Sequence, residues 1–126
     1  MNLDQLTAFA DEKIIIITGK NAIGKSLLAK SLIGDLSYAF IQARFKVIPK
    51  FIYETVDENT KVFLIDDISP NNIEYFIFNH FGPITIKRRN KEPFTTKLIT
   101  IITIDENVNL PIGSSFKRRI KHIHID

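Results

Sequence analysis

Eight consecutive residues near the start of the chain have the types and spacing of a phosphate-binding loop. Gly19-Lys20-Asn21-Ala22-Ile23-Gly24-Lys25-Ser26 matches the pattern G-x-x-x-x-G-K-[ST]. The glycines allow backbone N–H groups to turn towards phosphate oxygens, and the start of a following helix adds partial positive charge. Lys25 would reach the β- and γ-phosphates of ATP, and the Ser26 hydroxyl would hold Mg²⁺. The residues expected to surround the nucleotide are Gly19, Asn21, Ala22, Ile23, Gly24, Lys25, Ser26 and Leu27.

Two adjacent carboxylates follow the apolar run at residues 62–65. Because functional groups gather at the carboxyl ends of parallel strands, we expect Asp66 and Asp67 to lie beside the phosphate loop. Asp66 would help to hold Mg²⁺, and Asp67 would polarise the attacking water. Two adjacent acids favour hydrolysis, because a transfer kinase needs no base aimed at water. The alternative is an acidic pair that only begins a loop.

Two further sites add polar groups that could act on a γ-phosphate. The run at residues 98–104 predicts a buried strand, which would bring Thr103 and Asp105 to the same edge to sense the phosphate or orient water. Arg118 and Arg119 lie just before the last predicted strand. In ring ATPases an arginine from a neighbouring subunit reaches the γ-phosphate. The alternative for Thr103 and Asp105 is an ordinary threonine in a buried strand that ends in an acid. The alternative for Arg118 and Arg119 is a solvated basic turn.

Basic residues are unevenly distributed in a chain whose net charge is only +3. Four of them, Lys87, Arg88, Arg89 and Lys91, fall on a short stretch between two predicted strands at residues 84–86 and 94–96. Cations gathered on one hairpin repel one another unless they meet phosphate, so this hairpin is a predicted nucleic-acid contact. A solvated turn that protects a sheet edge is the alternative. The three histidines, His80, His122 and His124, have no metal-binding spacing and are interpreted as structural or surface residues.

The predicted elements alternate between strands and helices. Strands are expected at residues 13–18, 61–65, 98–104 and 122–125, with shorter candidates at 39–41 and 45–48. Helices are expected at residues 2–11, 27–33 and 71–80, and a short helix or turn at each of 51–56 and 116–120. Ser69-Pro70 predicts a helix N-cap, and Gly34-Asp35 predicts a helix end. Strands that are apolar throughout predict an α/β fold with a parallel sheet covered by helices on both faces.

Composition limits the classes of protein that need considering. The 126 residues suffice for one domain, so residues 1–126 are predicted to form a single core. No apolar run reaches the length of a membrane span, and the acidic, polar start is unlike a signal peptide. The absence of cysteine excludes disulfides, thiolate metal sites and cysteine nucleophiles, and fits an intracellular, soluble protein.

The order of these motifs resembles that of superfamily 3 helicases, which are P-loop ATPases of the AAA+ type. The likeness runs over residues 13–125 and is strongest to the helicase domain of replication-initiator (Rep) proteins of small circular single-stranded DNA viruses and plasmids. It is carried by the phosphate loop, Val62-Phe63-Leu64-Ile65-Asp66-Asp67, the basic hairpin with Pro93-Phe94, Ile101-Ile102-Thr103-Ile104-Asp105 and Phe116-Lys117-Arg118-Arg119-Ile120.

The resemblance implies roles for these segments. The phosphate loop would be Walker A, Asp66 and Asp67 Walker B, and the stretch from Lys87 or Arg88 to Pro93 a B′ hairpin that grips DNA in a central channel. Residues 103–105 fall on motif C, where Asp105 stands in place of the usual asparagine. Arg119 or Arg118 falls on the arginine finger. The fold implied is an AAA+-like five-stranded parallel sheet with a basic hairpin inserted.

The function implied is a helicase or translocase core that hydrolyses ATP with Mg²⁺. It would form a homo-oligomeric ring, a hexamer by likeness, and move single-stranded DNA, or less readily RNA, in the cytoplasm or in a host nucleus if viral. Rep proteins carry a nicking domain ahead of this core, so we expect a stand-alone core, a fragment or a reduced relative. One alternative is a small P-loop phosphotransferase. The other is a non-catalytic nucleotide-dependent nucleic-acid-binding module, which is favoured if Asp105, in place of asparagine, disables the sensing of the γ-phosphate.

Overall fold

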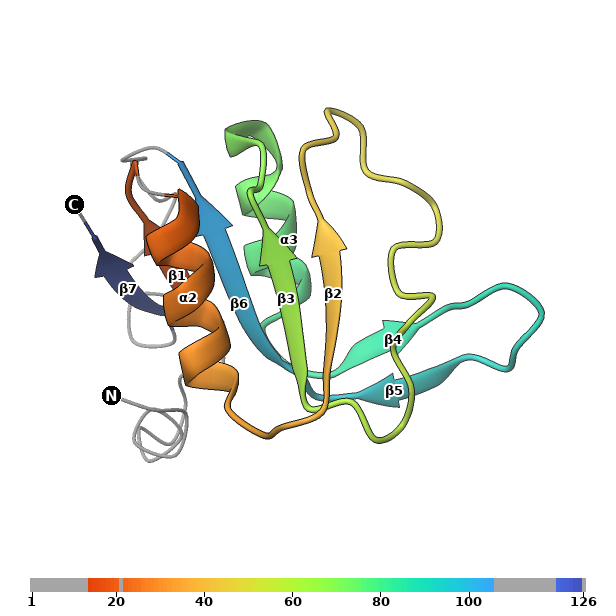
Figure 1. Cartoon of the computed structure of the whole chain (residues 1–126). Coiled ribbons are helices and arrows are strands. Elements are labelled where there is room, and N and C mark those ends of the chain that lie inside the picture. The colour runs from red at the N-terminus through yellow and green to blue at the C-terminus, as the bar shows by residue number, and fades with distance from the viewer. Residues whose placement is uncertain (1–13, 21, 106–119, 126) are drawn as a thin grey trace.

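Five parallel strands form the central sheet of the protein (Figure 1). The computed structural model describes residues 14–20, 22–105 and 120–125, and for residues 22 and 23 it describes the backbone only. The strands stand in the order β2-β3-β6-β1-β7. They are β1 (Ile14–Thr18), β2 (Tyr38–Gln42), β3 (Val62–Asp66), β6 (Ile99–Ile104) and β7 (Ile120–His124). The predicted α/β fold with a parallel sheet is therefore confirmed.

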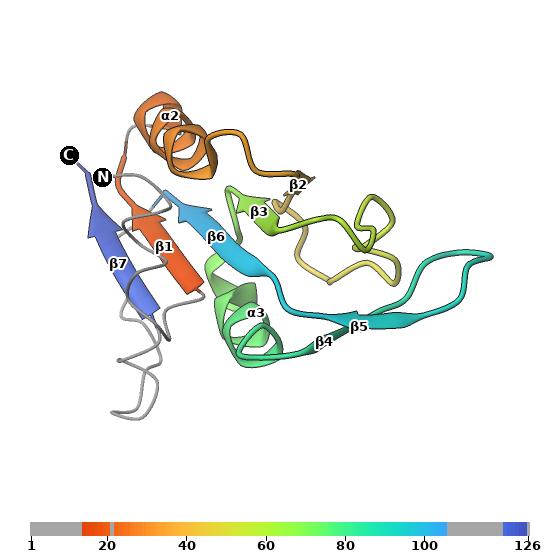
Figure 2. The same ribbon diagram turned by 90° about the horizontal axis from the view of Figure 1, so that it is seen from below.

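Helices cover both faces of the sheet, as the apolar strands predicted (Figure 2). Helix α2 (Ala22–Ile33) covers one face, and α3 (Ile73–Asn79) covers the other. Alternate residues of β1 face opposite sides: Ile15 packs in the α2 cluster and Ile16 in the α3 cluster. All five residues of β1 are buried. A strand buried on both sides needs a continuous apolar run, because no position of it faces water.

The C-terminal end of α2 and the N-terminal start of α3 are both marked by residues that the sequence singles out. Gly34 adopts a φ of +58°, and its N–H donates to the Lys30 carbonyl at 3.1 Å, which confirms the predicted end of α2. The predicted N-cap at Ser69, with proline at the first helical position, is confirmed, although the Ser69 hydroxyl makes no capping hydrogen bond. The backbone instead forms a 3₁₀ turn, η1 (Pro70–Asn72), in which the Asn72 N–H donates to the Ser69 carbonyl at 2.9 Å. The α-helix therefore begins at Ile73, later than predicted.

A separate antiparallel hairpin projects from the lower end of the central sheet in Figure 1. Its strands are β4 (Ile84–Ile86) and β5 (Phe94–Thr96), and Thr85 pairs with Thr95 at its centre. Ile84 and Ile86 are buried and join the core on the α3 side of the sheet. The predicted hairpin around the basic stretch is confirmed, with residues 87–93 forming its tip.

The long connection from β2 to β3 contains no helix or strand. The candidate strand at residues 45–48 is wrong, because that segment bends without pairing, whereas the candidate at 39–41 is confirmed as β2. Residues 50–55 form turns. The predicted helix at 2–11 and residues 116–119 of the predicted short helix or turn at 116–120 lie outside the described residues. Neither described helix has the length and apolar character required to cross a membrane.

Candidate functional site

The chain turns from β1 into α2 at Gly19, the first glycine of the predicted phosphate loop. Gly19 has a φ of +146°, and a Cβ built there would lie 2.1 Å from the carbonyl oxygen of Ile125. That oxygen is fixed because the Ile125 N–H donates to the Thr18 carbonyl at 2.9 Å, at the end of the β1–β7 pairing. Only glycine fits this close backbone approach. The glycine of the motif is therefore required by the sheet itself, whatever the segment binds.

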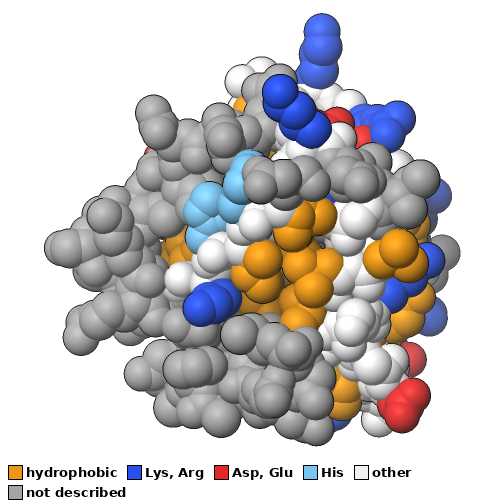
Figure 3. Space-filling view, turned by 60° about the vertical axis from the view of Figure 1, so that its left-hand side comes forward, with side chains coloured by type: hydrophobic (Ala, Val, Ile, Leu, Met, Phe, Trp, Pro, Cys, Tyr) orange, Lys and Arg blue, Asp and Glu red, His pale blue; other side chains and the backbone are white. Residues whose placement is uncertain are grey.

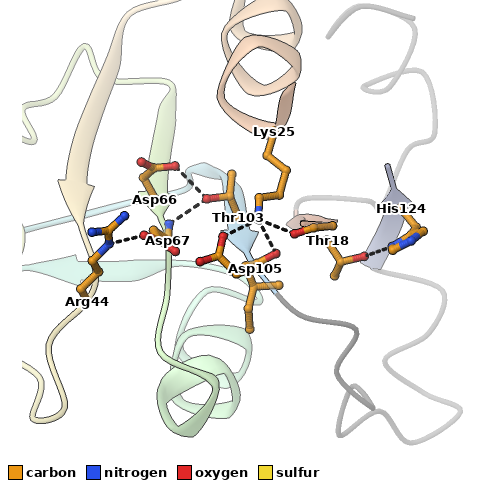
Figure 4. A network of polar contacts seen from close by, with 10 residues as sticks. Thr18, Lys25, Arg44, Asp66, Asp67, Thr103, Asp105 and His124 are labelled. Atoms are coloured by element: carbon orange, nitrogen blue, oxygen red, sulfur yellow. Dashed lines mark hydrogen bonds and ion pairs between the residues drawn. The ribbon is translucent and has the colours of Figure 1, made fainter. Parts of the chain in front are cut away.

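Lys25 extends from the first turns of α2 to the carboxyl end of β6 (Figure 4). Its side chain is only 2% exposed, and its Nζ donates to three oxygens. These are the carbonyl of Gly19 at 2.6 Å, the carbonyl of Ile104 at 3.0 Å and Oδ1 of Asp105 at 2.6 Å. A buried ammonium needs such partners, since its charge has lost the stabilisation of water. Sequence reasoning did not foresee that Asp105 would be one of them.

The hydroxyl of Thr103 joins the two carboxylate positions at the end of β3. Its Oγ1 donates to Oδ1 of Asp66 at 2.7 Å and accepts the backbone N–H of Asp67 at 2.7 Å. Thr103 is 1% exposed, so this hydroxyl cannot exchange its partners for water. Strand β6 lies between β1 and β3, which brings its polar end between the Gly19 turn and the acids. Thr103 was predicted to sense phosphate; its contacts make it a support for Asp66 and Asp67.

Asp67 is held by an ion pair with Arg44, a residue that the sequence analysis did not single out. Arg44 Nε donates to Oδ2 of Asp67. Arg44 follows β2, where the Ala43 N–H donates to the Asp66 carbonyl at 2.8 Å and ties this segment to the end of β3. Asp67 itself has a φ of +59°, an uncommon left-handed backbone for a residue other than glycine. A single arginine after an edge strand carries no motif, so only its position in the fold identifies it.

Electrostatics at this edge favour the ionised form of Asp105. The hydrogen bond from Lys25 and the positive charge of that residue hold the pKa of the Asp105 carboxyl below its usual value, with smaller contributions from Asp67 and Arg44. Burial acts in the opposite direction but does not prevail. The two cations, Lys25 and Arg44, face three carboxylates, Asp66, Asp67 and Asp105, so these five groups sum to a single negative charge.

The structure therefore brings together Lys25, Asp66, Asp67, Thr103 and Asp105, as the sequence predicted (Figure 4). Gly24 and Ser26 flank Lys25 on α2, and the side chain of Leu27 is 64% exposed. Ala22 and Ile23 belong to the first turn of α2. Asn21, Arg118 and Arg119 lie outside the described residues. In the part of the chain that is described, no three His, Cys, Asp or Glu residues are arranged to hold a metal ion by themselves.

Two of the histidines lie next to the Gly19 turn. The Thr18 hydroxyl lies 2.8 Å from both His122 Nε2 and His124 Nδ1, so it donates to at most one of them. Figure 4 shows the contact with His124. Partial burial, together with the charge of His124, lowers the pKa of His122. In the space-filling view of Figure 3, histidine side chains lie at the surface next to a group of hydrophobic side chains.

His80 is a structural residue in the core. It is fully buried, stacks on Phe63 with ring centroids 5.7 Å apart, and lies within 2.9 Å of the Tyr53 hydroxyl and 2.8 Å of the Thr100 hydroxyl. Burial lowers the pKa of His80 to about 4 and raises that of Tyr53. His80 is therefore neutral at physiological pH, and it links the end of α3 to β6 and to the turn at residues 50–55.

The basic hairpin presents its lysines and arginines differently. Lys87 and Lys91 are exposed at the tip. Arg88 is folded back, with a side chain 9% exposed, 3.8 Å from Glu58 and 5.0 Å above the ring of Phe94. Its Nε is buried without a hydrogen-bond partner in the described part of the chain. The four cations are therefore not equivalent, since Arg88 is folded back while Lys87 and Lys91 face outwards.

Arg89 contacts the β2–β3 connection. Its guanidinium lies 5.0 Å from the ring centroid of Phe51, and its backbone N–H donates to Oε1 of Glu54 at 2.7 Å. These contacts fix the hairpin against the turns at residues 50–55.

When the chain is compared with protein-family models and with curated proteins, it matches neither.

Proposed function

We propose that this chain is the core of a Mg²⁺-dependent ATPase of the P-loop, AAA+-like type that acts on single-stranded nucleic acid. The observation that carries the proposal is the convergence of Lys25 with Asp66, Asp67, Thr103 and Asp105 at one edge of a parallel sheet. This is where ligands bind in open α/β sheets. The interposed strand β6, between the strand of the loop and the strand of the acids, agrees with the AAA+-like class that the sequence resembles.

Each residue has a role in this proposal. Lys25 would exchange Asp105 for phosphate oxygens, with help from the positive end of α2. Asp67 would orient the attacking water once Arg44 has released the Asp67 carboxylate. Asp105, at the same edge of the sheet, would sense the γ-phosphate or orient water. Thr103 would keep the Asp66 carboxylate and the Asp67 backbone in position. A site that sums to one negative charge needs a further cation before it can accept a triphosphate.

Mg²⁺ fits that requirement. It prefers oxygen ligands and is commonly held by one or two carboxylates together with substrate phosphates. Asp66 and Ser26 are the residues that would hold it. When bound, the ion would neutralise charge on the phosphate oxygens.

Nucleic acid is the proposed partner because the hairpin offers exposed cations, although it leaves the sheet at the end opposite to the carboxyl ends of the strands, where Lys25 lies (Figure 1). Lys87 and Lys91 are exposed, and Arg89 extends the positive surface towards Phe51. Assembly into a ring, with Arg119 or Arg118 acting on the neighbouring subunit, remains part of the proposal by resemblance. It makes specific activity depend on protein concentration.

Hydrolysis of ATP by the purified chain tests the proposal. We expect Mg²⁺-dependent turnover that a single-stranded oligonucleotide stimulates. Asp67→Asn should lower turnover by orders of magnitude while nucleotide still binds, whereas Asp66→Asn should weaken Mg²⁺-dependent binding. Turnover that is the same in both variants as in the wild type would place the chemistry elsewhere.

A non-catalytic nucleotide-dependent binding module is the second candidate. It is favoured by the pairing of both Lys25 and Asp67 with protein charges, which leaves each group satisfied without a ligand. This candidate predicts nucleotide binding and nucleic-acid binding without turnover. Phosphate transfer to a small acceptor would instead identify a phosphotransferase.

A further inference from the structure

An aromatic pocket lies between the edge strand β2 and the turns that follow it, and none of its lining residues belongs to the cluster around Lys25. Its volume is about 310 Å³, and its apolar walls include Phe40, Phe45 and Phe51. Phe40 is 48% exposed although it lies on a strand of the central sheet. Clusters of half-exposed aromatic rings of this kind are more typical of binding surfaces than of the remaining protein surface.

Cations surround this pocket. Lys50 Nζ lies 5.4 Å from the ring centroid of Phe51, and the guanidinium of Arg89 lies 5.0 Å from the same centroid. The rim segment, residues 44–50, contains three basic residues and no acidic one. The pocket is thereby continuous with the basic hairpin, whose backbone is hydrogen-bonded to Glu54 on the pocket wall. Charge therefore favours a ligand that has an anionic part outside the pocket.

The interior of the pocket is suited to a neutral ring. Besides its aromatic walls it contains the Gln42 amide, the Thr55 hydroxyl and the Glu54 carboxylate. The carboxylate repels phosphate but accepts hydrogen bonds from amino groups, and the amide both donates and accepts. The volume is at the lower end for small-molecule sites, which suits one planar ring system better than a whole nucleoside triphosphate.

We propose that this pocket binds one unpaired base of a single-stranded nucleic acid, with the adjoining phosphates on Lys50, Arg89 and the hairpin lysines. The base would stack on Phe40 or Phe51, as bases do on aromatic side chains in single-strand-binding proteins. The inference rests on the nucleic-acid part of the proposed function and adds to it a base-binding subsite. It requires an unpaired base, because a base within a duplex cannot enter.

The experiment compares a labelled single-stranded DNA oligonucleotide with the same strand carrying abasic positions, by fluorescence anisotropy. The variants are Phe40→Ala and Phe51→Leu, the second of which keeps an apolar side chain but removes the ring. Tyr38→Ala is the matched control, because Tyr38 is also 48% exposed and lies on the same face of β2 but does not line the pocket. Circular dichroism melts establish that each variant is folded.

We expect at least one of the two variants, the one that removes the stacking ring, to lose about 5- to 150-fold in affinity for the base-bearing strand, the range for one base–aromatic stack. Affinity for the abasic strand, the salt dependence of binding and the behaviour of Tyr38→Ala should stay as in the wild type. A 2-aminopurine base in the strand should be quenched on binding to the wild type and less quenched by Phe40→Ala. Equal affinity of wild type and both folded variants for the base-bearing strand would overturn the proposal.

Other outcomes separate this inference from the proposed function. Strand binding that depends on the hairpin lysines, but not on Phe40 or Phe51, removes only the pocket proposal. Absence of any strand binding by the wild type removes the pocket and the nucleic-acid part of the function, while Lys25-dependent ATP turnover is judged on its own. If Phe40→Ala changes the sedimentation of the protein and leaves strand affinity intact, the pocket is a contact between copies and the proposal is wrong.

Discussion

Lys25 and Asp105, eighty positions apart in the sequence, form an ion pair in which Nζ lies 2.6 Å from Oδ1. The ammonium is 2% exposed and the carboxylate is 55% exposed, so the pair joins the interior to the surface. A phosphate that reaches Lys25 must take the place of the Asp105 oxygen. In the proposed function, Asp105, which the resemblance assigns to motif C, would therefore compete with the nucleotide for Lys25.

Asp105→Asn should tighten nucleotide binding. An amide oxygen accepts a weaker hydrogen bond from Lys25 than a carboxylate does, by about 1 kcal/mol, and this corresponds to about three- to fivefold in affinity after allowance for the exposure of Asp105. Turnover should fall in the same variant if Asp105 orients water. Equilibrium binding and single-turnover hydrolysis measure the two effects separately. Weaker binding in Asp105→Asn would mean that the carboxylate assists the ligand.

Thr103→Val should slow hydrolysis more than it weakens nucleotide binding. Valine keeps the shape of threonine but leaves the Asp67 N–H and the Asp66 carboxylate without their shared hydroxyl. The loss of a buried partner costs about 1–3 kcal/mol, which should appear as lower stability and as a lower turnover rate. Thr103→Ser, which keeps the hydroxyl, is the matched control and should restore turnover. A valine variant with unchanged turnover shows that Thr103 does not position the acids.

Folding stability should depend on pH through His80. Its pKa is about 4 in the folded protein and near 6.5 when the chain is unfolded, so the unfolded state binds the proton more readily between these values. The free energy of unfolding should therefore fall by about 3 kcal/mol as the pH drops from 6.5 to 4. Urea unfolding at both ends of this range measures the loss.

His80→Gln provides the comparison, because glutamine can hydrogen-bond Tyr53 and Thr100 but does not titrate. His122, whose pKa is also lowered, contributes to the pH dependence in both proteins and cancels in their difference. The wild type should lose more stability than the variant on acidification. A difference between the two proteins that does not change with pH contradicts the role given to His80.

The lysines of the hairpin should account for its salt-dependent affinity for a single strand. Replacing Lys87 and Lys91 by alanine should make the logarithmic salt slope shallower by about 1.4, since each phosphate contact on a single strand contributes about 0.7. Stability should hardly change, because both side chains are exposed. Arg88→Ala should instead lower the melting temperature, as it removes the contacts with Phe94 and Glu58. An unchanged slope in the lysine variant excludes the hairpin as a phosphate contact.

Strands β1, β3 and β6 were predictable because each is a run of mainly apolar residues rich in Ile and Val, or in Ile and Thr, which is typical of a strand buried on both faces. The sequence also predicted the convergence of Lys25, Asp66, Asp67 and Asp105, because acids and a lysine that follow parallel strands must meet at one edge. The hairpin was predictable for a similar reason, since a polar tip lay between two short apolar runs.

Other features depend on contacts between distant residues and have no local signal. Nothing near Arg44 in the sequence indicates that it pairs with Asp67, and nothing in the basic run indicates that Arg88 folds back onto Phe94. The α-helix begins later than predicted because the residues after Ser69 form a tight 3₁₀ turn, which satisfies the backbone without the Ser69 hydroxyl. The strand predicted at residues 45–48 failed because β2 already forms the edge of the sheet and the chain leaves it at Ala43.

Binding of Mg²⁺-ATP to the wild type, Lys25→Ala and Lys30→Ala, measured by isothermal titration calorimetry, tests the central claim most directly. Both lysines belong to α2, but Lys25 points to the acids while Lys30 is exposed near the other end of the helix. We predict binding by the wild type and Lys30→Ala, and a loss of about tenfold or more in Lys25→Ala, as expected for removal of a charge-assisted hydrogen bond to phosphate. Equal binding by all three folded proteins, or by none of them, would contradict a nucleotide site at this edge.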